Sequence, residues 1–351
     1  MSIITVLGEI DERELGPTLM HEHVFIDFRC AFLPPEEVTL KRRAYEKISL
    51  ENLGWIRYYP RSNLHNLVLD EEEVALKELL DFRASGGGTV VDVTTQGIGR
   101  DPVALRRVSI LSGVNIVMGA GFYMGAGFYT HENYPEELRK LSEQRMRDIM
   151  KKEITEGVGD TGVRAGIIGE IGCSYPLHEV EERALRAAVE VQDELGVAIT
   201  IHPGREESAP FEIIDLLRDA GADLSKVIMG HIDRTIFSEE RLRELAETGC
   251  FIQYDMFGLE TSYYQFNPSV YMRSDEQRIR ELLQLREWGH INQILVSHDI
   301  CMKMRLKSYG GHGYSHILEN IVPRMKMRGF TDEDIRKILV ENPARALSIS
   351  Q

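Results

Sequence analysis

The sequence predicts a single (β/α)8 barrel that spans residues 1–351. Eight short apolar runs rich in β-branched residues recur along the chain, separated by longer stretches of helical periodicity, and this alternation is typical of a parallel sheet. No Ser/Pro-rich linker, low-complexity tract or long charge block divides the sequence into domains. A doubly wound open sheet is the alternative fold, but no GxGxxG motif follows the first apolar run.

The eight apolar runs are the predicted barrel strands, because each has the length and residue types of a buried strand. They cover residues 18–26, 89–94, 114–118, 165–171, 197–202, 227–231, 251–254 and 294–298. Amphipathic stretches between them predict helices that include residues 70–84, 179–195, 210–220, 238–248 and 275–288. Gly196, Gly221 and Gly249 directly follow three of these stretches, at the position where glycine commonly ends a helix.

Two segments are longer than ordinary barrel connections. Residues 28–69 follow the first apolar run and residues 255–274 follow the seventh. Loops at the carboxyl ends of barrel strands build active sites, so we expect both segments to form walls of the site. A tandem hexapeptide, Met118–Tyr123 repeated as Met124–Tyr129, is either a local duplication that lengthened a loop or a mobile glycine-rich flap near substrate.

Composition excludes several classes of partner. Lysine and arginine total 41 against 56 aspartate and glutamate, a formal net charge of −15 that repels nucleic acid and anionic lipid but leaves room for a local basic pocket. No apolar run approaches the ~20 residues of a membrane span. The first residues lack the cationic start and apolar segment of a signal peptide. Cys30, Cys173, Cys250 and Cys301 show no CxxC spacing, which predicts reduced thiols in a cytoplasmic protein.

The tripeptide His21-Glu22-His23 lies in the first predicted strand. Residues i and i+2 of a strand face the same side, so both imidazoles can hold one metal ion. Alone, the pair is weak evidence for a metal site, because two ordinary surface or core histidines explain it as well.

Further metal-ligating residue types fall at the ends of other predicted strands. Glu170 lies near the end of the fourth, His202 and His231 end the fifth and sixth, and Asp299 follows the eighth. Singly, each has a structural explanation, such as a hydrogen-bonded histidine or a helix N-cap. Together with the histidine pair they concentrate ionisable groups at one end of the barrel, which costs free energy unless cations pair them. The pattern predicts two divalent metal ions, with zinc favoured and manganese, iron or cobalt as alternatives.

This arrangement resembles the metal-binding pattern of the amidohydrolase superfamily, and in particular its phosphotriesterase family. The resemblance to the phosphotriesterase-related branch runs from Thr5 to Leu347. Where the organophosphate hydrolases of the family carry a carboxylated lysine, this chain has Gly169 followed by Glu170, so the resemblance implies a glutamate bridge and at most a side activity on organophosphates. The segments that carry the resemblance are Leu19–His23, Gly119–Tyr123, Gly166–Cys173, Ile201–Arg205 and Lys307–Ile317.

The resemblance implies a binuclear amidohydrolase that cleaves N-acetyltaurine, or a similar small N-acyl amino sulfonate or acid, to acetate and taurine. In the mechanism that the resemblance implies, two metal ions would acidify a water that attacks the acetyl carbonyl, and Asp299 would carry a proton from this water to the leaving amine. A lactonase or esterase acting on a phosphorylated sugar lactone is the alternative activity, and a non-catalytic ligand-binding barrel is the alternative outside enzymes. The implied ligands are His21, His23 and Asp299 for one ion and His202 and His231 for the other, with Glu170 bridging them.

A small anionic substrate requires a cation near the site. Arg205 is the preferred candidate because it lies three residues past His202, and Lys303, Arg234 and Arg305 follow other predicted strands. Each is equally compatible with an ordinary surface ion pair. Tyr123, at the end of the third predicted strand, is a further candidate for contact with substrate or a packed rim aromatic. The oligomeric state stays open, with a homodimer among the alternatives.

Overall fold

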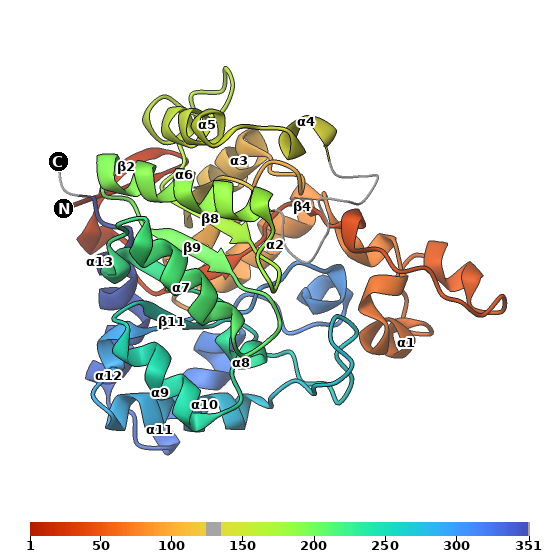
Figure 1. The fold of residues 1–351 in the computed structure, drawn as a ribbon. Helices are drawn as coiled ribbons and strands as arrows, with labels where there is room; N and C mark the ends of the chain where they lie inside the picture. Colours follow the sequence, from red (N-terminus) through yellow and green to blue (C-terminus); the bar gives the residue numbers. More distant parts are fainter. Residues whose placement is uncertain (124–134, 350–351) are drawn as a thin grey trace.

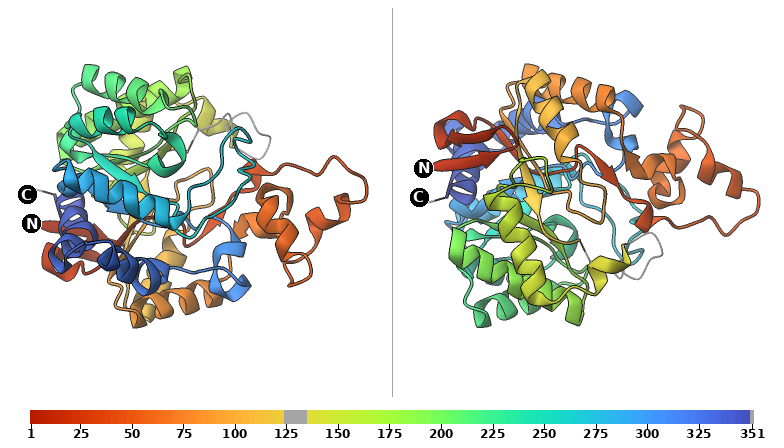
Figure 2. Two further views of the ribbon diagram at one scale, coloured as in Figure 1. Left: turned by 90° about the horizontal axis from the view of Figure 1, so that it is seen from below. Right: turned by 90° about the horizontal axis from the view of Figure 1, so that it is seen from above.

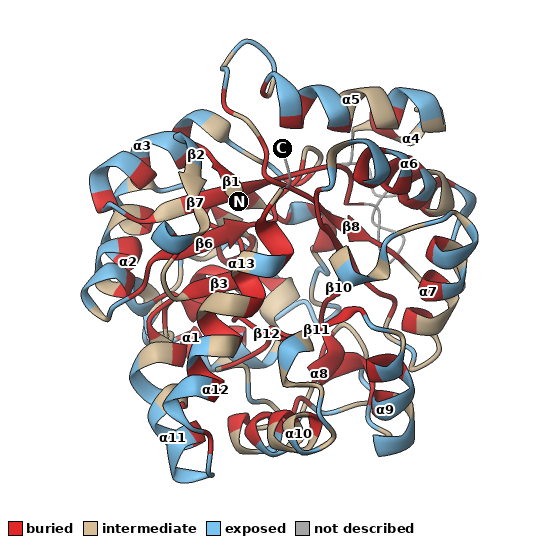
Figure 3. Cartoon of the chain, turned by 90° about the vertical axis from the view of Figure 1, so that its left-hand side faces the viewer, coloured by how far each residue is buried: buried red, intermediate tan, exposed pale blue. Residues whose placement is uncertain are grey.

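The computed structural model describes residues 1–123 and 135–349. Eight strands pair in parallel in the order in which they occur in the chain, and Figure 3 shows the helices as a ring around them. The predicted (β/α)8 barrel is therefore confirmed, and each predicted apolar run overlaps one barrel strand; the third and fourth strands extend two residues and one residue past their predicted ends. The barrel strands are β3 (Thr18–Glu22), β6 (Thr89–Asp92), β7 (Asn115–Ala120), β8 (Ile167–Gly172), β9 (Ile199–His202), β10 (Val227–Met229), β11 (Phe251–Tyr254) and β12 (Ile294–Val296).

The predicted helices are confirmed within two residues at either end. Helix α6 ends at Gly196, whose φ of 65° is left-handed and suits a residue without a Cβ. The helices are α1 (Leu53–Tyr58), α2 (Glu72–Ala84), α3 (Pro102–Ser112), α4 (Glu136–Arg139), α5 (Glu143–Thr155), α6 (Glu179–Leu195), α7 (Ala209–Asp219), α8 (Ile232–Thr235), α9 (Glu239–Glu247), α10 (Asp275–Glu287), α11 (Val322–Met327), α12 (Asp332–Arg336) and α13 (Asn342–Leu347). A hairpin of β1 (Ser2–Thr5) and β2 (Gly8–Asp11) and a two-stranded antiparallel sheet of β4 (Ile26–Asp27) and β5 (Val68–Leu69) complete the fold. In the described part of the chain, no helix has the length and apolar character needed to cross a membrane.

Side chains of successive strand residues alternate between two apolar clusters. Val90 packs in the cluster that includes the helices, whereas its neighbour Val91 packs inside the barrel. The inner cluster takes one residue from or beside each strand: Met20, Val91, Val117, Ile167, Ala198, Ile228, Phe251 and Leu295. It also contains Ile3 and Leu347, so the first hairpin and α13 close the barrel at the end where the strands begin.

The chain termini and the long segment 28–69 lie at opposite ends of the barrel. Ser2 and Ile349 pair through a hydrogen bond of 3.0 Å from the amide of Ile349, and both termini lie at one end of the barrel. The segment 28–69, which includes α1, projects at the opposite end, as Figures 1 and 2 show. The second hexapeptide copy, Met124–Tyr129, lies outside the described residues.

Candidate metal centre and active site

All six predicted ligands meet at the carboxyl ends of the strands, where they are buried. Three of the ligands belong to barrel strands: His21 lies in β3, Glu170 lies in β8, and His202 is the last residue of β9. Three ligands lie just beyond strand ends, namely His23 after β3, His231 after β10 and Asp299 after β12. The sequence rule that the ends of parallel strands meet at one edge accounts for this convergence.

The carboxylate of Glu170 lies among all four histidine rings. Its Oε2 atom is 3.2 Å from Nε2 of His21, 3.0 Å from Nδ1 of His202 and 3.3 Å from Nε2 of His231. Its Oε1 atom is 3.4 Å from Nε2 of His23. A single carboxylate therefore touches both predicted pairs of imidazoles.

Asp299 completes the cluster on the side of His23. Its Oδ1 atom lies 3.2 Å from Nε2 of His23 and 3.8 Å from Nε2 of His21. Asp299 and His231 have φ values of 53° and 55°, in the left-handed region that residues with a Cβ rarely adopt. This strained backbone occurs at two of the six ligand positions, as is typical of functional sites.

Residues behind the cluster fix the histidine rings. Asp255 Oδ1 lies 2.7 Å from Nδ1 of His231, and its Oδ2 accepts the amide of His231 at 3.0 Å. Gln253 Nε2 lies 2.9 Å from Nδ1 of His21, and Thr94 Oγ1 lies 2.8 Å from Nδ1 of His23. The opposite ring nitrogens are thereby turned toward Glu170. Sequence reasoning missed these three residues, although Asp255 directly follows β11 and the strand-end rule that identified Asp299 applies equally to it.

The donor set fits divalent metal ions. Nε2 of His21 is buried and has no hydrogen-bond partner among the described residues. Nδ1 of His202 and Nε2 of His231 lie 2.7 Å apart, both close to Glu170. Burial opposes charge on the rings, but Asp299 and Glu170 raise the pKa of His23 to about 10, and Asp255 and Glu170 raise the pKa of His231 to about 10. The carboxylates thus favour a positive charge between the imidazole rings, and a mixed set of imidazole and carboxylate ligands suits zinc and related ions.

Replacing Asp255 with asparagine is expected to weaken metal binding by about 10–100-fold, the range for partners that orient a ligating histidine. The amide keeps the volume but loses the charge that faces His231. Competition with a chelator measures the metal dissociation constant. Asp215→Asn, on the exposed face of α7, is the matched control, and equal affinity in both variants would contradict this role for Asp255.

A cavity opens onto the cluster of candidate ligands, and His23, Glu170, His202 and Asp299 form part of its lining. The two long segments form its walls as the sequence predicts, residues 28–69 through Phe28, Arg57 and Pro60, and residues 255–274 through a larger set. Most of the wall is apolar or aromatic, which is typical of a small-molecule site with few polar anchors. The larger set is Met256, Leu259, Thr261, Tyr263, Tyr264, Gln265 and Phe266.

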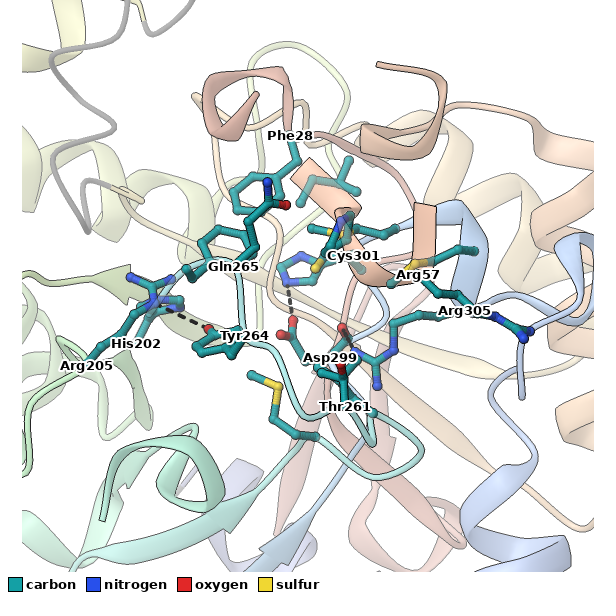
Figure 4. A pocket seen from close by; sticks show the side chains of 18 of the residues that line it. Phe28, Arg57, His202, Arg205, Thr261, Tyr264, Gln265, Asp299, Cys301 and Arg305 are labelled. Atoms are coloured by element: carbon teal, nitrogen blue, oxygen red, sulfur yellow. Dashed lines mark hydrogen bonds and ion pairs between the residues drawn. The ribbon is translucent and has the colours of Figure 1, made fainter. Parts of the chain in front are cut away.

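Three of the predicted substrate contacts line this cavity. Figure 4 shows Arg205 beside His202 on one side and Arg305 on the other, with Asp299 between them. Tyr123 also lines the cavity, with its hydroxyl 3.4 Å from Nε2 of His202.

The other two predicted contacts lie elsewhere. Lys303 is buried in a separate pocket, where its ammonium group pairs with Asp70 at 3.4 Å and with Glu71. Arg234 is fully buried and donates to the carbonyl oxygens of Pro203 and Gly204 at 2.9 and 3.1 Å. The structure therefore does not bring either cation to the central cavity.

A barrel with a buried imidazole and carboxylate cluster at the carboxyl ends of its strands defines a metal-dependent hydrolase. The sequence model of the phosphotriesterase family matches residues 1–347. The chain belongs to this family of binuclear metal-dependent hydrolases.

Relatives cover nearly the whole chain. It is 47% identical over 367 residues to an N-acetyltaurine hydrolase of Dictyostelium discoideum, which covers 99% of this chain and 98% of that protein. It is 46% identical over 348 residues to the N-acetyltaurine hydrolase of Homo sapiens, with 98% and 97% covered.

Solved structures agree with this assignment. A resiniferatoxin-binding protein from Rhodobacter sphaeroides is 37% identical with a TM-score of 0.93, covering 99% of this chain and 95% of that one. A lactonase from Listeria monocytogenes is 25% identical with a TM-score of 0.80, and all of both chains is covered.

Proposed function

We propose that the protein hydrolyses N-acetyltaurine, or a closely similar small N-acyl amino sulfonate or acid, to acetate and taurine. The relatives named for this reaction align over nearly the full chain. The observation that carries the proposal is the placement of one guanidinium group, that of Arg205, in the same cavity as the metal-ligating cluster.

Arg205 has the properties of an anion-binding residue. Its Nε donates to the hydroxyl of Tyr264 at 3.3 Å, and its guanidinium lies 4.8 Å from the centre of the Phe266 ring. No carboxylate forms an ion pair with it within residues 1–123 and 135–349. A half-buried guanidinium held by neutral aromatic side chains keeps its charge for a sulfonate or carboxylate of the substrate.

We propose that the six ligands are divided between two metal ions. We assign His21, His23 and Asp299 to one ion, His202 and His231 to the other, and Glu170 to both, with zinc as the favoured metal. Bound divalent ions supply an acidified water and polarise the acyl carbonyl.

Asp299 supplies the proton transfer. Its carboxylate faces the cavity and is ready to accept the proton of the attacking water. An alkyl amine is a poor leaving group unless protonated, so the same carboxyl then donates that proton to the amide nitrogen. Arg205 holds the sulfonate and fixes the direction of the amide.

Replacing Arg205 with alanine is expected to lower kcat/KM for N-acetyltaurine by about 10–150-fold, since loss of a charged hydrogen-bond partner costs ~1.5–3 kcal/mol. An uncharged N-acetyl amine should lose much less, because it never uses this contact. Acetate release from the two substrates provides the measurement.

Arg324→Ala, at an exposed position of α11, is the matched control for this experiment. Equal losses on the charged and uncharged substrates would assign Arg205 to support of the fold or the metal ligands instead. No acetate release by the zinc-loaded protein would overturn the proposed function.

A lactonase is the second candidate, favoured by the similarity to the lactonase of Listeria monocytogenes over the full chain. The same metal ligands serve lactone opening, and Arg205 serves the phosphate of a sugar lactone as well as a sulfonate. A panel of lactones assayed beside N-acetyltaurine separates the two activities. A purified protein with well under one metal per chain would instead favour a non-catalytic binding barrel.

We also propose a cytoplasmic location. All four cysteines of the sequence are free thiols, and Cys30, Cys173 and Cys250 are buried. Free buried thiols are typical of proteins in reducing compartments.

A further inference from the structure

Arg305 is bound on all three of its nitrogen atoms by neutral acceptors. Its side chain is 95% buried, since its relative exposure is 5%. Nη1 donates to the backbone oxygen of Asp299 at 2.8 Å, and Nη2 donates to the backbone oxygen of Phe257 at 3.1 Å. Nε donates to Nε2 of His312 at 3.3 Å. The guanidinium therefore joins the segments that follow β11 and β12 to the glycine-rich segment around His312.

The backbone of Asp299 is held from both sides. Its amide donates to the oxygen of His21 at 3.1 Å, and its oxygen accepts the amide of Cys301 at 2.9 Å in addition to Arg305. These contacts surround a residue with a φ of 53°, a conformation that costs free energy in a residue with a Cβ. The direction of the Asp299 carboxylate toward His23 depends on this conformation.

The segment Gly310–Gly313 closes tightly on Arg305. A Cβ on Gly311 would lie 2.1 Å from the backbone carbon of Arg305, so only glycine fits there. The amide of Gly313 donates to the oxygen of Arg305 at 2.9 Å. His312 packs against Gly258, where a Cβ would lie 2.5 Å from its ring. The close packing of this glycine-rich segment thus places the His312 imidazole against the Arg305 guanidinium.

His312 accepts a hydrogen bond through Nε2 and must be neutral to do so. Burial and the charge of Arg305 hold the pKa of His312 well below its ordinary value. Its Nδ1 lies 3.0 Å from the oxygen of Gly313, where it donates. Both ring nitrogens are therefore engaged, and the ring is fixed.

We propose that Arg305 is a positioning residue that, together with His312, holds the left-handed backbone of Asp299 and so aims its carboxylate at the metal centre. Although Arg305 lines the cavity, its guanidinium group already donates hydrogen bonds to two backbone oxygens and one imidazole. Binding of a substrate anion would require these hydrogen bonds to break. The inference rests on the proposed role of Asp299 as ligand and proton carrier, and it assigns the substrate anion to Arg205 on the opposite side (Figure 4).

The experiment compares Arg305→Lys and Arg305→Met with the wild type. Lysine keeps the charge but lacks the planar fork. We expect kcat to fall by about 10–100-fold for both N-acetyltaurine and an uncharged N-acetyl amine, and zinc affinity by chelator competition to fall by a similar factor. The KM for either substrate should change by less than about twofold, since ground-state binding is untouched.

His312 provides a second pair of variants that leave Arg305 in place. His312→Gln keeps an acceptor for Nε of Arg305, whereas His312→Ala removes it. We expect the glutamine variant to retain more of both kcat and zinc affinity than the alanine variant. Arg280→Met, at an exposed position of α10, is the control for loss of an arginine.

Two results would overturn the proposal. The first is a loss confined to the KM of the charged substrate, which would make Arg305 a substrate contact. The second is unchanged kcat and zinc affinity in variants of either residue that match the wild type in circular dichroism and Tm. If the wild type fails to cleave N-acetyltaurine, the proposed function fails, whereas zinc affinity in the same variants still decides the role of Arg305.

Discussion

Replacing Asp299 with asparagine is expected to lower kcat for N-acetyltaurine by about 10²–10⁴-fold, the range for a positioned acid–base group. In the wild type, Oδ1 of Asp299 lies 3.2 Å from Nε2 of His23. The amide of asparagine keeps one oxygen that can occupy this position, so part of the metal should stay bound. What it cannot do is take a proton from water and return it to nitrogen. The fold-decrease in kcat should therefore exceed the fold-decrease in metal content.

A substrate with a good leaving group separates the two roles of Asp299. An activated acetyl ester needs no proton on its leaving group, so its hydrolysis should suffer less than that of the alkyl amide. Metal content is measured on the same preparation, and Asp332→Asn, at an exposed position, is the matched control. Unchanged turnover of both substrates would exclude Asp299 as the proton carrier.

Replacing Glu170 with glutamine is expected to lower activity by at least ~10²-fold, beyond the ~10–100-fold range for residues that only orient ligands. Glu170 touches all four histidines, and His21 and His202 hold its pKa well below the ordinary value against the effect of burial. A neutral amide leaves the buried imidazoles without the anion that balances cations between them. The isosteric change removes charge with little change in packing.

The number of bound ions is the decisive measurement for Glu170. Elemental analysis should find close to two ions per wild-type chain and fewer in the variant, and the deficit should persist after incubation with excess zinc. Glu143→Gln, at a partly exposed position in the first turn of α5, serves as the control. A variant that still binds two ions with wild-type affinity would contradict the bridging assignment.

The strands and the convergence of the six candidate ligands could be predicted because both depend on local patterns. A strand of alternating inner and outer residues such as Val90 and Val91 is encoded within a few positions. Its carboxyl end lies at the same edge as those of its parallel neighbours, so a ligating residue at each end implies a shared site. His21, Glu170 and His202 needed no further information.

Pairings between distant segments could not be predicted in this way. Lys303 follows β12 as the rule for substrate cations requires, yet Glu71, 232 positions away in sequence, neutralises it. Arg305 also follows β12, but its partners are backbone oxygens and an imidazole that lie close only after the loops fold. Arg205 stays available to bind an anion because its neighbours Tyr264 and Phe266 are neutral, and both come from the distant segment 255–274. Side-chain partners, unlike strand ends, are set by how loops pack.

The pairing of Ser2 with Ile349 on the face away from the cavity has a practical consequence for handling the protein. A tether, affinity tag or fused domain attached at either end leaves the barrel on the far side from segment 28–69 and its cavity. Molecules immobilised on a bead or electrode by a terminus therefore present the cavity to the solution. The adjacent ends also allow a short linker to join them, with new ends opened in an exposed helical connection, so the chain is suited to circular permutation.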